Sequence, residues 1–109
     1  MVTNNSESEI TLVNLFTVKP EKQQSTANQV AEIYKTVVSK QPGFICARIH
    51  KSLDGTKVAA VARWESQEAL EAMQQTSDFQ NAIPSLEHEI VSAEPHIYEV
   101  ICILGETGA

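Results

Sequence analysis

The feature that most constrains the fold of this chain is the order in which strand-like and helix-like hydrophobic patterns follow one another. Residues 10–18 are rich in β-branched and aromatic side chains, as expected for a strand. In residues 27–38 the apolar side chains instead follow a helical period of about 3.6 residues. They are Ala27, Val30, Ala31, Tyr34, Val37 and Val38. A helix that begins near Pro20 and ends at Pro42 therefore follows the first strand.

A β-hairpin is predicted next. Residues 44–51 alternate loosely between apolar and polar side chains, which favours a second strand. Asp54 and Gly55 indicate a tight turn, because glycine adopts a positive φ without steric hindrance. Residues 56–65 then form the returning third strand.

Short helical segments separate the hairpin from the last strand. Ser66 is a suitable N-cap for a helix that carries Leu70 and Met73 on its apolar side. Ser77 and Gln80 fit a capping box, which starts a further helical piece.

Two prolines bear on the C-terminal part of the chain. Pro84 is expected to disturb the second of these helices. The fourth strand lies within residues 90–104, with residues 96–104 as its clearest part. Because Pro95 lacks an N–H donor for a strand ladder, it should lie at a bulge, at the start of the strand or in an edge strand.

The order strand, helix, strand, strand, helix, strand predicts an α+β fold of the ferredoxin-like βαββαβ type with an antiparallel sheet. Both helices should then cover one face of this sheet. The opposite face is expected to be too apolar to meet water, because it would hold Val13, Leu15, Ile45, Ala47, Ile49, Ala59 and Val61. A second copy packed on that face would give a dimeric α/β barrel, so we expect a homodimer through the sheet face.

Length and composition set the remaining limits. A chain of 109 residues has room for one domain, which we place at residues 10–104 between disordered tails at residues 1–9 and 105–109. The formal charge is −6 and no cluster of lysine and arginine occurs, which argues against nucleic acid and anionic membrane surfaces as partners. The N-terminus lacks the pattern of a secretory signal, so a cytoplasmic location is expected.

Cysteine and histidine give no metal or disulfide signal. Cys46 and Cys102 are far apart in apolar runs, and we expect two buried free thiols. His50, His88 and His96 are scattered, and successive residues around His88 cannot face one metal ion together on a helix. We therefore expect no metal and no bound cofactor.

Four short motifs follow one another at characteristic distances along the chain. They are VNLFTV at residues 13–18, QPGF at 41–44, DG at 54–55 and RWES at 63–66. Together they resemble the antibiotic biosynthesis monooxygenase family and its dimeric α/β-barrel relatives, over roughly the whole predicted domain. The resemblance implies the same ferredoxin-like fold that the hydrophobic pattern predicts.

For members of this family that act on anthrones, the resemblance implies oxidation of a planar phenolic or polycyclic small molecule by O2 without flavin, haem or metal. Such members have an asparagine in the first strand and a tryptophan at the end of the third, which here match Asn14 and Trp64. The resemblance implies that these two residues are catalytic. Some members also use a tyrosine and a following arginine as a proton relay, whereas this chain has Leu70 and no later lysine or arginine.

The residues themselves suggest where a substrate would bind. Asn14 shares a strand face with apolar neighbours, and two alanines next to Trp64 would leave room for a flat ligand. The substrate-binding residues expected on this basis are Leu12, Phe16, Tyr34, Ala60, Ala62, Phe79 and Ile83. The alternative is that Asn14 is a hydrogen-bonded core amide and that Trp64 fills the core under the second helix.

Two other functions remain open. Haem-degrading relatives of the same fold also pair an asparagine with a tryptophan, but they need an axial histidine at the position that Ile83 occupies here, with His88 about one turn further on. A non-catalytic or isomerase-like domain that binds a small metabolite is the third hypothesis, because fold alone does not determine function.

Overall fold

One antiparallel sheet forms the base of the fold, with its strands in the order β2-β3-β1-β4. These strands are β1 (Ile10–Val18), β2 (Phe44–Lys51), β3 (Lys57–Trp64) and β4 (Ile90–Glu99). The computed structural model describes residues 9–105, so the tails predicted at residues 1–9 and 105–109 lie almost wholly outside the described residues. The strand order and directions confirm the predicted ferredoxin-like fold.

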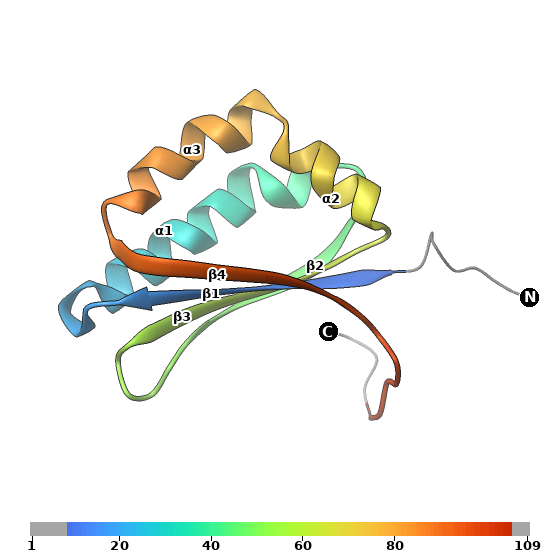
Figure 1. Ribbon diagram of the computed structural model, residues 1–109. Coiled ribbons are helices and arrows are strands. Elements are labelled where there is room, and N and C mark those ends of the chain that lie inside the picture. The colour runs from blue at the N-terminus through green and yellow to red at the C-terminus, as the bar shows by residue number, and fades with distance from the viewer. Residues whose placement is uncertain (1–8, 106–109) are drawn as a thin grey trace, which may run out of the picture.

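The helices all lie on one face of the sheet (Figure 1). They are α1 (Gln23–Thr36), α2 (Gln67–Gln74) and α3 (Ser77–Glu87), with short 3-10 turns η1 (Pro20–Lys22) and η2 (Val38–Lys40) on either side of α1. In the described part of the chain no helix covers the other face of the sheet. The structure thus has two layers, and the core lies between them.

Strand β3 shows most clearly why the core forms where it does. Its side chains alternate strictly between buried and half-buried, and the buried ones are Val58, Ala60, Ala62 and Trp64. A half-buried strand has this two-residue period because successive side chains point to opposite faces of the sheet. The Trp64 ring is fully buried and meets the edge of Phe44 at a centroid distance of 5.5 Å.

The predicted helix starts are partly correct. Ser66 caps α2 as expected, since its side chain accepts a hydrogen bond from the backbone N–H of Ala69. The cap of α3 is Thr76 rather than the predicted Ser77, because the Thr76 hydroxyl accepts the hydrogen bond from the Phe79 N–H. Pro84, which was expected to disturb α3, lies inside this helix and does not end it.

Replacing Thr76 by alanine is expected to lower the free energy of unfolding by about 1 kcal/mol, because the first turn of α3 loses its cap. Urea denaturation followed by circular dichroism measures the change. Ser77→Ala is the matched control and should change the free energy of unfolding much less. An equal loss in both variants would contradict the position of the cap.

One strand is out of phase with the prediction. A bulge between Phe44 and Cys46 shifts the pairing of β2 with β3. As a result Ala47 and Ile49 pack into the core under the helices, whereas they were expected on the opposite sheet face. Ile45, at the bulge, is 39% exposed. The loose alternation in the sequence reflects this irregularity, which a fixed two-residue period cannot follow.

The last strand is shorter at its C-terminal end than predicted. Glu99 pairs with Ile10, the first residue of β1, so residues 100–104 have no strand beside them and lie exposed outside β4. For the same reason Cys102 is exposed, and the expected burial of this thiol is wrong. Pro95 lies in the edge strand, which is one of the positions predicted for it.

Candidate active site

A cavity of about 260 Å³ lies between the helices and the β1–β4 half of the sheet. Strands β2 and β3 contribute no side chain to its lining. The sheet supplies Leu12, Asn14, Phe16, Ile90, Ala93 and Pro95. The helices supply Val30, Ile33, Tyr34, Met73, Gln74, Phe79, Ile83, Leu86 and Glu87. The lining is mostly apolar with a few polar groups, as is typical of small-molecule sites.

Asn14 is the polar group that the sheet presents to this cavity. It lies on β1 between Pro95 of β4 and Ala60 of β3, and the small alanine leaves the amide room on one side. The Oδ1 atom of Asn14 is buried and has no hydrogen-bond partner. Buried amide groups are normally paired, because an unpaired one forfeits its bonds to water without replacement. A ligand atom in the cavity would provide the missing partner.

Tyr34 reaches the same cavity from α1. Burial raises the pKa of its hydroxyl to about 12, because the surroundings disfavour the charged phenolate. The hydroxyl therefore stays protonated at neutral pH. It can orient a ligand by hydrogen bonding, but it cannot take up a proton as a general base.

Five predicted binding residues line the cavity and three predicted positions do not. Leu12, Phe16, Tyr34, Phe79 and Ile83 are part of the lining. Ala60, Ala62 and Trp64 are buried in the packed core instead. The expectation that these three side chains line the cavity is therefore wrong.

The position of Trp64 follows from the register of the sheet. Trp64 pairs with Ile10, whereas Asn14 pairs with Ala60, so both side chains are on the helix-covered face but at different heights along it. The indole packs with Val38 and Leu70. Leu12 and Met73 belong both to this cluster and to the cavity wall, so the cluster that contains Trp64 adjoins the cavity.

Several lining residues were not predicted, although a signal for them exists. One helical stripe along α3 carries Phe79, Ile83, Leu86 and Glu87. The helical period therefore indicates Leu86 and Glu87 as lining residues once Phe79 and Ile83 are predicted to line the cavity. Met73 was placed on the apolar side of its helix and was not assigned to the site. The contribution of β4 could not be anticipated because its register with β1 was unknown.

Histidine and metal chemistry find no support in the described residues. Ile83 lines the cavity where haem-degrading relatives would need a histidine, and His88 follows the end of α3, exposed and outside the lining. No histidine lines the cavity within residues 9–105. The same range contains no group of three or more His, Cys, Asp or Glu side chains that could hold a metal ion.

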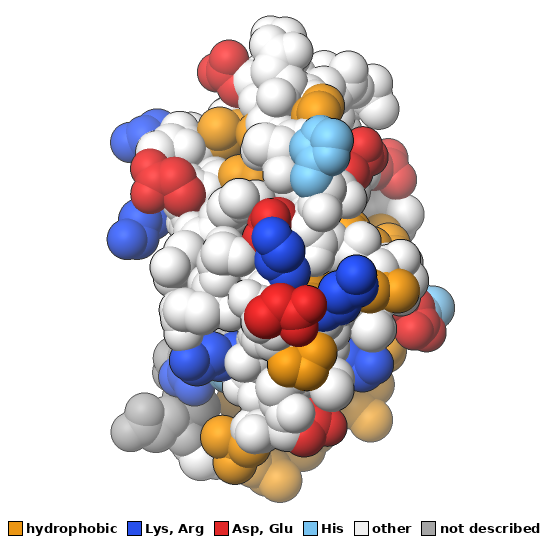
Figure 2. All heavy atoms as spheres, turned by 90° about the vertical axis from the view of Figure 1, so that its left-hand side faces the viewer, with side chains coloured by type: hydrophobic (Ala, Val, Ile, Leu, Met, Phe, Trp, Pro, Cys, Tyr) orange, Lys and Arg blue, Asp and Glu red, His pale blue; other side chains and the backbone are white. Residues whose placement is uncertain are grey.

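The surface shows no large region of one charge sign on the face in Figure 2, where basic and acidic side chains are interspersed. Lys22 forms an ion pair with Glu89, with 3.7 Å between Nζ and Oε2. Such a surface gives no support for binding to a phosphate backbone. Within the described residues, no helix combines the length and apolar character needed to cross a membrane.

Comparison with known proteins places this chain in a family. The sequence profile of antibiotic biosynthesis monooxygenases matches residues 9–85, which is most of the chain. The chain belongs to the antibiotic biosynthesis monooxygenase family. The match runs from β1 into α3 and stops before β4, so Ile90, Ala93 and Pro95 of the cavity lie beyond it.

One curated relative is also a monooxygenase. The tetracenomycin-F1 monooxygenase of Streptomyces glaucescens is 38% identical over 63 residues, which cover 58% of this chain and 56% of that protein. The chain therefore matches little more than half the length of this curated relative.

Solved structures agree on the fold. SnoaB, a cofactor-independent oxygenase from Streptomyces nogalater, superposes with a TM-score of 0.74 at 22% identity, covering 91% of this chain and 99% of that one. A conserved protein from Methanosarcina mazei Go1 gives a TM-score of 0.75 at 23% identity, covering 86% of this chain and 94% of that one.

Proposed function

We propose that this member of the family is a cofactor-independent monooxygenase that oxidises a planar phenolic or polycyclic small molecule with O2. The observation that carries the proposal is the buried Oδ1 of Asn14, which has no partner and lies in a mostly apolar cavity. An amide in this position can orient a substrate oxygen and, by presenting its N–H group, stabilise negative charge that develops there. The similarity to a tetracenomycin-F1 monooxygenase supports the same class of substrate.

The proposed reaction needs only the substrate and O2. A hydroxy-aromatic ketone such as an anthrone loses a proton from its central CH2 group to water, and the resulting carbanion passes electrons to O2. Oxygen then bonds to that carbon as a peroxide, which takes up the proton released in the first step, and loss of water gives the quinone. One oxygen atom enters the product and the other leaves as water, so O2 is the oxidant and the substrate is oxidised.

The protein supplies position and surroundings for these steps. The unpaired Oδ1 of Asn14 would accept a hydrogen bond from a substrate hydroxyl, while the amide N–H of the same side chain would donate to the oxygen on which negative charge develops. Tyr34 offers a hydroxyl that keeps its own proton. Apolar side chains such as Phe79 and Ile83 keep bulk water away from the carbanion. Trp64 does not line the cavity. It supports the cavity wall through the core cluster that it shares with Leu12 and Met73.

The cavity volume limits the size of the substrate. An apolar cavity of about 150 Å³ takes up one benzene molecule. The cavity of about 260 Å³ therefore encloses roughly two fused rings, and a third ring would extend into the mouth.

Incubation of the purified, metal-free protein with 1,8-dihydroxyanthrone under O2 tests the proposal. Quinone should appear in the visible spectrum at the rate at which an oxygen electrode records O2 consumption. Binding of the anthrone without O2 consumption would instead favour the metabolite-binding or isomerase-like function. A Soret shift on titration with haem would favour the haem-degrading alternative.

We also infer that two copies of the chain associate through the sheet face that no helix covers. Val13 and Leu15 of β1 lie beside Ala59 and Val61 of β3 on this face, and all four are half-buried in the single chain. A second copy would remove this apolar strip from water. Such a dimer would have the barrel-like core expected from the sequence.

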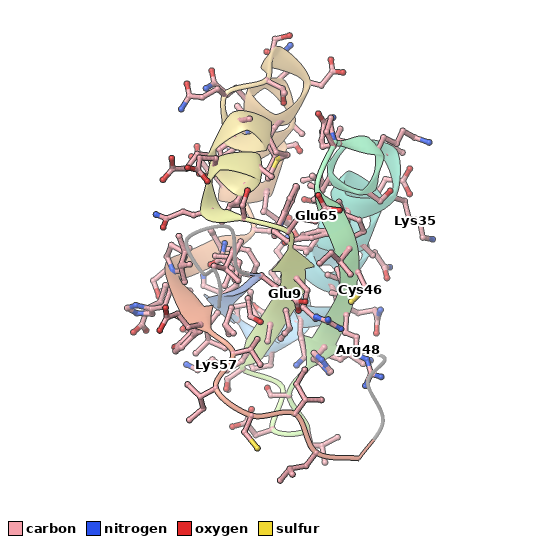
Figure 3. The ribbon with its side chains drawn as sticks, turned by 90° about the vertical axis from the view of Figure 1, so that its right-hand side faces the viewer. Glu9, Lys35, Cys46, Arg48, Lys57 and Glu65 are labelled. Atoms are coloured by element: carbon pink, nitrogen blue, oxygen red, sulfur yellow. The ribbon has the colours of Figure 1, made fainter. Side chains whose placement is uncertain are left out.

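Polar groups flank the apolar strip at one end. Figure 3 shows Glu9, Cys46 and Arg48 near one another below the helices. Arg63 makes an ion pair with Glu9 there, and its hydrogen bond lowers the pKa of the Glu9 carboxyl. These charges would form the rim of the interface, where they favour a single orientation of the partner over others.

Val61→Asp is expected to convert the dimer to a monomer, because a carboxylate would be buried in the centre of the interface. Light scattering after size-exclusion chromatography measures the molar mass. Leu53→Asp is the control, since this hairpin residue is fully exposed and away from the strip. A wild-type protein that elutes as a monomer, or a Val61 variant that stays dimeric, would contradict the inferred interface.

A further inference from the structure

The sheet has an open edge on each side in the single chain. Among the described residues, β2 ends the sheet on one side and β4 ends it on the other. The outer N–H and C=O groups of an edge strand can pair with another chain, and proteins usually cover or protect them. In a closed barrel every strand has two neighbours, so no edge remains. A second copy on the helix-free face could therefore cover both edges.

The segment that follows β4 is apolar and exposed. Residues 100–104 read Val-Ile-Cys-Ile-Leu, and Ile101 and Leu104 are 93% and 84% exposed. Such β-branched residues favour a strand, but Glu99 already pairs with Ile10, the first residue of β1. The segment bends toward the helix-free side of the sheet (Figure 1). Pairing with an edge strand of a second copy on that side would bury its side chains.

The helix-free face carries opposite charges along its two edges. Arg48 of β2 pairs with Val61 and therefore lies on this face, on the side of the sheet away from the helices (Figure 3). Glu94 of β4 pairs with Leu15 and lies on the same face, with its carboxylate 3.3 Å from the ring of His96 on the same strand. Arg48 and Glu94 are both exposed, and the apolar strip lies between them.

These charges select one orientation of a partner. In a two-fold symmetric homodimer the same face of both copies meets. With the axis perpendicular to the strands, β2 would meet β2 and β4 would meet β4, so Arg48 and Glu94 would each face a like charge. With the axis parallel to the strands, β2 meets β4 of the other copy, and Arg48 faces the partner's Glu94. Opposite charges favour this second arrangement.

The strand directions fit the same arrangement. Each neighbouring pair in the sheet is antiparallel, so β2 and β4 run in opposite directions. An axis parallel to the strands leaves their directions unchanged, and β4 is then antiparallel to β2 of the partner. Antiparallel neighbours can form a regular ladder of hydrogen bonds.

We propose that β4 of each copy lies along β2 of its partner and that residues 100–104 continue β4 as a strand on the free edge of that β2. The two four-stranded sheets then close into one barrel around the apolar strip. The arrangement rests on the sheet-face dimer inferred with the proposed function, and it does not depend on the substrate or on the reaction.

An exchange of charges tests the orientation. Arg48→Glu and Glu94→Arg should each raise the dissociation constant of the dimer about tenfold, because two-fold symmetry places each like-charge contact in the interface twice. The double variant restores opposite charges and should return the constant to within about threefold of the wild-type value. Sedimentation equilibrium measures these constants. Lys35→Glu and Glu32→Arg are the matched controls, since both residues are exposed on α1, on the other side of the sheet.

Hydrogen exchange tests the segment after β4. The backbone N–H groups of residues 100–104 should exchange at least about tenfold more slowly in the wild-type dimer than in the Val61→Asp monomer. Fast exchange in both proteins would overturn the added strand. Slow exchange in both would place the segment on its own chain and would overturn the added strand as well.

The outcomes separate the orientation from the dimer itself. Single variants that dissociate like the wild-type protein, or a double variant that stays as weak as the single ones, would overturn the pairing of β2 with β4, while the sheet-face dimer would stand. A wild-type protein that is monomeric at every concentration would overturn both. The rate of anthrone oxidation is a separate measurement, so the proposed reaction stands or falls on its own.

Discussion

Asn14→Ala is expected to lower the rate of anthrone oxidation by about a hundredfold to a thousandfold, the usual effect of removing one donor that faces a developing oxyanion. The apolar lining offers no substitute for this amide on the β1 side of the cavity. Initial rates of quinone formation under saturating O2 measure the change, and kcat should fall more than KM rises. Such a pattern indicates an interaction that strengthens in the transition state.

The same substitution should leave the fold intact. Because the Oδ1 of Asn14 has no partner within the protein, alanine removes an unpaired buried group and breaks no hydrogen bond to that atom. The free energy of unfolding is therefore expected to stay the same or rise by about 1 kcal/mol. An essential core amide would behave in the opposite way and lose stability.

Asn28→Ala provides the matched control for this experiment. Asn28 is exposed on α1, bonds to the Gln24 side chain and lies outside the cavity, so its loss should change neither rate nor binding. If Asn14→Ala oxidises the anthrone at the wild-type rate, the amide is not part of the reaction.

The largest expected effect on stability comes from Gly43→Ala, which should lower the free energy of unfolding by about 2–5 kcal/mol. Two penalties combine at this residue. Its φ of 87° lies in the left-handed region, which side chains other than glycine rarely adopt. A Cβ atom at this position would also lie 2.4 Å from the Cβ of Ala69 in α2, so the helix or the loop would have to move.

Gly55→Ala separates these two penalties. Gly55 has nearly the same φ, 86°, but an added Cβ would make only ordinary contact, 3.7 Å from Pro20. Gly55→Ala should therefore lower the free energy of unfolding by only the cost of the left-handed conformation, about 1–2 kcal/mol. Urea denaturation of both variants measures the difference. Equal losses would show that the contact with Ala69 relaxes freely.

The geometry at Gly43 explains one motif on physical grounds. In the sequence, the proline and glycine of QPGF serve only to end a helix. In the structure the Gly43 carbonyl also accepts a hydrogen bond from the Glu65 N–H at 2.8 Å, and the residue packs directly against α2. Glycine is required here by close approach as well as by backbone conformation.

The sequence alone determined the identity and order of the elements. Burial of apolar area is the main favourable term in folding. The two-residue alternation of β3 therefore indicates which side of this strand is buried, and the helical stripe of α1 does the same for the helix. These patterns were sufficient to predict the ferredoxin-like fold and to place Asn14 on the face that the helices cover.

Only the tertiary structure decided which side chains surround the cavity. Periodicity gives the face of a strand but not the position along it, and the register that sets Trp64 opposite Ile10 moves the indole away from Asn14. Likewise, Pro95 and Glu87 reach the cavity through the pairing of β4 with β1 and the path of α3 across the sheet. Those arrangements depend on contacts between residues far apart in the chain, which no local pattern encodes.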